Sequence, residues 1–167
     1  MNAGARAPIL VLGVGNALLQ DDGVGPALVE RLRATRGTDP RVEFVDGGTL
    51  GLALLGWLEH RAALLVLDAV ELGAAPGTVH VIERPLDRGA ARGIGAHGGN
   101  AASLLGTAAL LGVLPHHVLV VGVEPRSIRT GTELDPDVER ALPRAAELAE
   151  RWIAARLSEL REGACTS

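Results

Sequence analysis

The hydrophobic positions of the chain fall into five runs of strand length, with turn-forming or helical segments between them. These runs are residues 8–15, 41–48, 62–70, 75–84 and 116–125. The run 62–70 (AALLVLDAV) is the most apolar, so it predicts a strand at the centre of a sheet. The run 75–84 (APGTVHVIER) alternates between apolar and polar residues, which indicates a strand at an edge.

Apolar residues at helical spacing predict helices between and after these strands. The predicted helices cover residues 25–36, 50–61 and 101–112 and a final segment that begins at 135–136. Asp135 is expected to cap the last helix and Pro136 to start it, whereas Pro143 is expected to kink it or to split off its first turns. The glycine-rich stretch 84–100 has no periodicity, and long segments of this kind are typically functional or mobile.

The alternation of strands and helices predicts an α/β fold, in which helices cover both faces of a mostly parallel, twisted sheet of about five strands. A chain of 167 residues is long enough for one ordinary core, so residues 1–160 are predicted to form a single domain. Residues 161–167 are predicted to be a flexible C-terminal tail.

Composition and charge exclude several classes of function. The net charge is −4 and all 16 cations are arginines without a basic run, so no nucleic-acid partner is expected. The absence of lysine excludes Schiff-base chemistry and a phosphate-binding P-loop. The lone cysteine, Cys165, cannot form an intramolecular disulfide, and no apolar run reaches membrane-spanning length. We therefore expect a soluble, cytoplasmic protein without a membrane partner.

Segment 9–25 (ILVLGVGNALLQDDGVG) begins like a nucleotide-binding strand and turn. Leu18 occupies the position of the third glycine of a dinucleotide fingerprint, and two carboxylates follow where a phosphate cradle needs amide groups and a lysine. A nucleotide-binding domain is therefore disfavoured. The chain also lacks the GxSxG, HExxH and CxxC patterns of common hydrolase and zinc sites.

Polar side chains follow the predicted strands, at their ends or in the next loop. They are Asn16, Asp21, Asp22, Asp46, Asp68, His97 and Glu124. Because ligands of an open parallel sheet bind outside the carboxyl ends of its strands, we expect these side chains to converge on one crevice. Carboxylates gathered in this way repel one another, and a divalent cation between them removes the repulsion. The pattern therefore predicts a metal site.

Several of these residues also have a structural alternative. Asp21 and Asp22 precede a helix and Asp46 precedes two glycines, where aspartate commonly accepts hydrogen bonds from turn amides. Asn16 can adopt left-handed backbone geometry or cap the following turn. Asp68 ends a strongly apolar strand, where an unpaired carboxylate is costly. The remaining histidines are expected at the surface or at strand ends: His60, His80, His116 and His117.

Six motifs in a fixed order narrow the function further. They are GVGNALLQDDGVG (13–25), DGGTLG (46–51), LDAV (67–70), APGTV (75–79), GAHGG (95–99) and GVEP (122–125). Together they resemble the hydrogenase maturation proteases, the endopeptidases that process the large subunit of NiFe hydrogenases. The resemblance runs from Ile9 to the last helix.

The resemblance implies a three-layer α/β/α sandwich of the phosphorylase/hydrolase-like kind. It also implies removal of a C-terminal extension from the hydrogenase large-subunit precursor once nickel is in place. It places nickel ligands at Asp22, Asp68 and His97, with the nickel presented by the precursor and no organic cofactor. Asp46 matches a further acidic position, so the expected catalytic residues are Asp22, Asp46 and Asp68, with Asp22 or Asp46 as candidate general base.

Three points stay open at this stage. His116 or His117 would supply the imidazole if His97 does not. A non-proteolytic nickel-binding maturation chaperone, which escorts the precursor without cutting it, is the alternative function. A crevice that admits a folded precursor favours a monomer.

Overall fold

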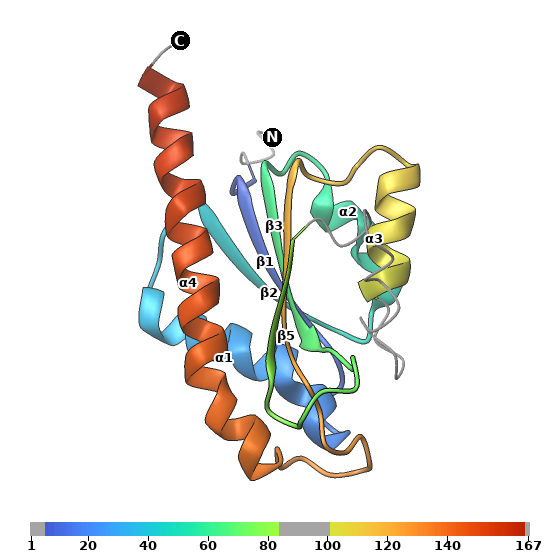
Figure 1. Ribbon diagram of the computed structural model, residues 1–167. Coiled ribbons are helices and arrows are strands. Elements are labelled where there is room, and N and C mark those ends of the chain that lie inside the picture. The colour runs from blue at the N-terminus through green and yellow to red at the C-terminus, as the bar shows by residue number, and fades with distance from the viewer. Residues whose placement is uncertain (1–5, 84–100, 166–167) are drawn as a thin grey trace.

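The computed structural model describes residues 6–83 and 101–165 and contains one five-stranded sheet (Figure 1). Its strands are β1 (Ile9–Val14), β2 (Val42–Gly48), β3 (Ala63–Ala69), β4 (Val79–Glu83) and β5 (His117–Val123). Their order is β2-β1-β3-β5-β4, and only β4 is antiparallel to its neighbour. The structure confirms the predicted mostly parallel sheet, its apolar central strand β3 and its edge strand β4.

Helices cover both faces of the sheet, which confirms the three-layer architecture (Figure 1). Helices α1 (Val24–Arg36) and α4 (Pro136–Cys165) lie on one face. The short 3-10 helix η2 (Gly51–Leu54), α2 (Leu55–Leu58) and α3 (Ala101–Leu110) lie on the other. Alternate residues of each strand face opposite ways, so β1 contributes Ile9 and Val11 to the core under α1 and α4. Its Leu10 and Leu12 pack under α2 and α3.

Helix α4 begins as the sequence predicts. The N–H of Asp137 donates to Asp135 Oδ1 (2.9 Å), and the N–H of Glu139 donates to the Asp135 carbonyl (2.8 Å), so Asp135 caps the helix. Pro143 does not divide α4, because the helix is one element from Pro136 to Cys165. Packing of the buried face of α4, which includes Ala145 and Ile153, offsets the cost of about 3 kcal/mol for a proline inside a helix.

The same helix continues through residues 161–165, which the sequence analysis assigned to a flexible tail. Leu157 is buried, and Leu160 packs against the core, so the preceding turns are anchored to the sheet. The residues that follow are mainly good helix formers, such as Arg161 and Glu162. Among the described residues, none of the helices is long and apolar enough to span a membrane.

The start of α1 lies directly against the carboxyl ends of β1 and β3. A Cβ atom at Gly25 would lie 2.1 Å from the carbonyl oxygen of Val14 and 2.5 Å from that of Leu67, so only glycine fits there. This close approach brings the short 3-10 helix η1 (Gln20–Gly23) to the end of the central strand. The acidic turn before α1 is therefore positioned by backbone packing.

Candidate active site

Asp22 and Asp68 come together at the carboxyl edge of the sheet, where η1 contacts the end of β3. Asp68 is the next-to-last residue of β3 and has no exposed surface, whereas Asp22 lies in η1 and is 4% exposed. The charge on Asp22 is one cause of the raised pKa of Asp68, which shows that the two carboxyl groups interact. Asp22 and Asp68 therefore lie near each other, while their shared role in the site stays a prediction.

Asp68 is a buried carboxyl group, and the nearby backbone N–H of Ala69 opposes its high pKa without forming a full hydrogen bond. Within the described part of the chain, neither of its carboxyl oxygens has a hydrogen-bond partner. Burial raises the pKa of Asp68 well above its ordinary value of 3.8, and the charge of Asp22 raises it further. This environment favours the protonated form of Asp68, and the group can exchange that proton for a cation that neutralises both carboxylates.

The turn that carries Asp22 is tightly built. The N–H of Asn16 donates to Asp22 Oδ2 (2.7 Å), and Asn16 Oδ1 accepts from the N–H of Leu18 (3.0 Å). Asn16 therefore caps the turn that follows it, which is one of the two structural roles predicted from the sequence. A Cβ atom at Gly15, whose φ is 129°, would lie 2.0 Å from the carbonyl oxygen of Asp22. Glycine at position 15 is thus required for the turn to close.

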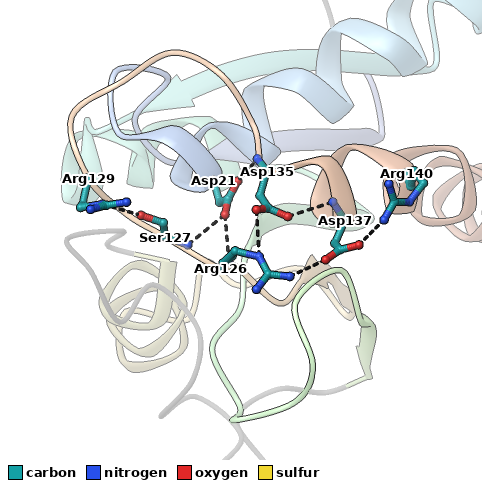
Figure 2. A network of polar contacts seen from close by, with 7 residues as sticks. All are labelled: Asp21, Arg126, Ser127, Arg129, Asp135, Asp137 and Arg140. Carbon is teal, nitrogen blue, oxygen red and sulfur yellow. Dashed lines mark hydrogen bonds and ion pairs between the residues drawn. The ribbon is translucent and has the colours of Figure 1, made fainter.

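Asp21, the neighbour of Asp22, has a different role. It is fully buried, and its Oδ2 accepts from the N–H groups of Arg126 (2.9 Å) and Ser127 (3.0 Å) (Figure 2). Its Oδ1 accepts from the N–H of Asp135 (2.7 Å). Asp21 therefore ties the loop after β1 to the loop between β5 and α4, which is the structural alternative for this residue.

Charged side chains at the start of α4 complete this network (Figure 2). The Arg126 guanidinium pairs with Asp135 (2.8 Å) and with Asp137, and Arg140 pairs with Asp137 one helical turn later. These aspartates and arginines are partly exposed, so their pairs contribute little individually. The three backbone hydrogen bonds to buried Asp21 are therefore the main contacts that hold the loop after β1 to the loop between β5 and α4.

Asp46 lies at the same edge but in a different environment. It is exposed, and its Oδ1 accepts from the N–H of Gly48 (3.0 Å), which is a typical turn contact of aspartate. The N–H of Gly15 donates to the Gly48 carbonyl (3.1 Å), so the end of β2 lies beside the turn that carries Asp22. The catalytic role of Asp46 stays a prediction.

Glu124, after β5, anchors the turn between β3 and β4. It is 3% exposed and accepts from the N–H groups of Leu72 (3.0 Å) and Gly73 (2.9 Å). It also contacts His80 Nε2 at 2.7 Å. His80 lies at the start of edge strand β4, as expected, and is partly buried by this contact. Although burial opposes ionisation, the hydrogen bonds from Leu72, His80, Gly73 and Ala74 lower the pKa of Glu124.

Glu124→Gln is expected to lower the free energy of unfolding by about 1–2 kcal/mol at neutral pH, because charged acceptors make the stronger hydrogen bonds. The folded pKa of Glu124 lies below 4.5, so its contribution is present above that pH and is lost as the pH falls through the folded pKa. Urea unfolding at about pH 7 and about pH 3.5 should show the difference shrinking. The exposed Glu59→Gln is the control, and an equal effect of both variants would contradict the anchoring role.

The candidate histidine ligands divide into two cases. His97 lies outside the described residues. His116 and His117 are at the opposite edge, because His117 pairs with Ala63 at the start of β3, five residues before Asp68. That separation is about 16 Å along the strand, so the prediction that either could replace His97 is wrong. Within residues 6–83 and 101–165, no three His, Cys, Asp or Glu side chains are grouped closely enough to hold a metal ion.

Comparison with known proteins identifies the family. Residues 26–152 match the family model of the hydrogenase maturation proteases. The hydrogenase expression/formation protein HupD of Rhodobacter capsulatus is 36% identical over 163 residues, which are 95% of this chain and 77% of HupD. The hydrogenase 2 maturation protease of Escherichia coli is 36% identical over 141 residues, which are 83% of this chain and 86% of that protein.

Solved structures agree with the sequence comparison. The hydrogenase maturating endopeptidase HybD from Escherichia coli superposes with a TM-score of 0.73 and 34% identity, and the alignment covers 93% of each chain. The hydrogenase 2 maturation peptidase from a Thaumarchaeota archaeon superposes with a TM-score of 0.67 and 35% identity, over 87% of this chain and 97% of the other. Fold, motif order and sequence identity thus agree over most of the chain, which belongs to the hydrogenase maturation protease family.

Proposed function

We propose that this protein is the endopeptidase that removes the C-terminal extension from the large-subunit precursor of a NiFe hydrogenase after nickel insertion. Its family membership supports proteolysis in hydrogenase maturation, since its relatives include a hydrogenase 2 maturation protease and the endopeptidase HybD. The observation that carries the proposal is the buried pair Asp22 and Asp68, in which the oxygens of Asp68 lack described partners.

In this proposal, the precursor brings the nickel to the pair. The ion, held by the precursor, docks at the carboxyl edge, and Asp22 and Asp68 each supply carboxylate oxygen to it. His97 is the proposed third protein ligand. Binding of the cation displaces the proton that the raised pKa of Asp68 favours, so the empty and occupied sites differ in protonation. The bound ion then positions the scissile bond and polarises it for attack by water, with Asp22 or Asp46 as general base.

Co-expression of the large-subunit precursor with the full chain tests the proposal. Mass spectrometry should show a shortened large subunit only when nickel is supplied and the wild-type chain is present. The double variant Asp22→Ala, Asp68→Ala should leave the precursor at full length, because it removes both carboxylates that would bind the ion. Normal processing by this variant would rule out the proposal that Asp22 and Asp68 recognise the nickel.

The same experiment separates a protease from a non-proteolytic nickel-binding chaperone. A chaperone would bind nickel tightly in isolation and would leave the mass of the precursor unchanged. We place the reaction in the cytoplasm with the protein acting as a monomer. The lone Cys165 suits a reducing compartment, and a monomer leaves the carboxyl edge open to a folded precursor.

A further inference from the structure

Four leucines with exposed side chains lie on the loops around the Asp22–Asp68 pair. The exposed fractions are 64% for Leu18, 60% for Leu50, 51% for Leu52 and 49% for Leu72. Leu18 follows β1, Leu50 and Leu52 follow β2, and Leu72 follows β3. Because β2, β1 and β3 are adjacent parallel strands, these loops emerge at the same edge of the sheet. We call the four residues the leucine collar.

The loops that carry the leucine collar contain no basic residue, and their acidic residues are the buried Asp21 and Asp22 and the exposed Glu71 beside Leu72. Segments 15–19, 47–58 and 72–79 lack Asp, Glu, Arg and Lys, although 22% of the whole chain is charged. Single exposed leucines are ordinary, but adjacent loops with several exposed leucines and no basic residue indicate a surface that contacts a partner. The composition suits an apolar ligand without acidic groups.

Hydrogen bonds within the loops fix three of these leucines. The N–H of Leu18 donates to Asn16 Oδ1 (3.0 Å), that of Leu50 to the Gly47 carbonyl (3.0 Å), and that of Leu72 to the carboxylate of Glu124 (3.0 Å). A side chain whose backbone is already fixed loses less conformational freedom when a partner covers it. The leucine collar is thus preorganised for binding.

We propose that the leucine collar is the docking surface for the apolar polypeptide that flanks the scissile bond of the substrate protein. This inference rests on the proposed proteolytic function. Asp22 and Asp68 are nearly inaccessible, so a broad flat surface does not reach them, and a narrow, extended polypeptide is the better fit to this edge. The collar loops also lack the basic residues that attract a lipid headgroup. These observations favour a polypeptide over a membrane as the occupant.

The test compares two leucine double variants in steady-state processing of nickel-loaded precursor. Leu18→Ser with Leu50→Ser should raise KM about 10- to 100-fold and leave kcat unchanged, because each leucine contributes roughly a tenfold factor to uniform binding. The control is Leu110→Ser with Leu111→Ser, whose side chains are 89% and 63% exposed at the end of α3, on the opposite edge. The control should match the wild type. An unchanged KM in the collar variant, or equal losses in both, would overturn the proposal.

A binding measurement distinguishes failure of the collar from failure of the proteolytic function. Precursor binding is measured with the Asp68→Asn chain as the parent, with and without the collar substitutions. If the wild type never shortens the precursor but the collar substitutions still weaken binding at least tenfold, the proteolytic function fails and the docking surface stands. Equal binding by both chains overturns the docking surface. Collar-dependent binding to phosphatidylcholine vesicles, or collar-dependent dimerisation, also overturns it.

Discussion

Replacing Asp68 with asparagine is expected to reduce precursor processing by at least about 100-fold and at the same time to stabilise the folded protein. The loss of activity follows if Asp68 supplies a carboxylate oxygen to the substrate-bound nickel, because a neutral amide is a weaker ligand. The gain in stability follows because the variant removes a buried carboxyl group that has no described hydrogen-bond partner. We expect a gain of about 1–3 kcal/mol at neutral pH.

The pH dependence of this gain has a definite sign. The pKa of Asp68 is raised in the folded protein, so wild-type stability is unaffected below about 3.8 and declines as the pH rises through the folded pKa. The Asp68→Asn variant lacks this decline. The stability difference between the two proteins should therefore be small in acid and should grow toward neutral pH.

Urea unfolding at several pH values and a processing assay at neutral pH measure both effects. Asp46→Asn is the matched control for the unfolding measurements alone, since Asp46 is exposed and its turn hydrogen bond to Gly48 can be kept by an amide oxygen. We expect the control to change stability by less than about 0.5 kcal/mol. An Asp68→Asn protein that is less stable than the wild type at every pH would contradict this account of the buried carboxyl group.

Replacing Asp21 with alanine is expected to lower the free energy of unfolding by about 3–5 kcal/mol. The substitution removes three hydrogen bonds from backbone N–H groups to a fully buried carboxylate and leaves those donors without their acceptor. The loops that these bonds join are more than 100 residues apart in the chain, so the connection is lost as a whole. Thermal unfolding should show a decrease of the midpoint by roughly 6–15 °C.

The variant Asp21→Asn is the graded control. Its amide oxygen can accept hydrogen bonds on one side of the site, but its NH2 group faces the remaining N–H donors. We therefore expect a decrease in the free energy of unfolding that lies between zero and that of Asp21→Ala. Substitutions of the two buried aspartates are thus expected to have opposite effects on stability. Loss of the Asp21 carboxylate lowers the free energy of unfolding, whereas loss of the Asp68 carboxylate raises it. An Asp21→Ala midpoint equal to that of the wild type would mean that backbone contacts such as Gln20 N–H to Gly131 hold the loops.

The sequence alone determined the architecture and indicated where the candidate site lies. Buried parallel strands require continuous apolar runs, and these runs predicted the five strands and the central position of β3. Side chains that follow parallel strands share one edge, which predicted that Asp22 and Asp68 would meet. The order of the motifs by itself indicated the family.

Only the tertiary structure decided the role of each polar residue. Asp21 and Asp22 are adjacent and chemically identical, yet on one 3-10 turn they point to different partners. Likewise, Glu124 holds the turn at Leu72, and His80 completes that contact from the edge strand.

The same limit explains two of the predictions that the structure changed. The packing of α4 on the sheet offsets the effect of Pro143, and the direction of β5 carries His117 away from the acidic pair. Most of these contacts end on backbone N–H groups, which every residue except proline possesses, so they leave no signature in the order of side chains. Sequence pattern records which surfaces are buried, whereas the fold decides which distant backbone groups meet a given carboxylate.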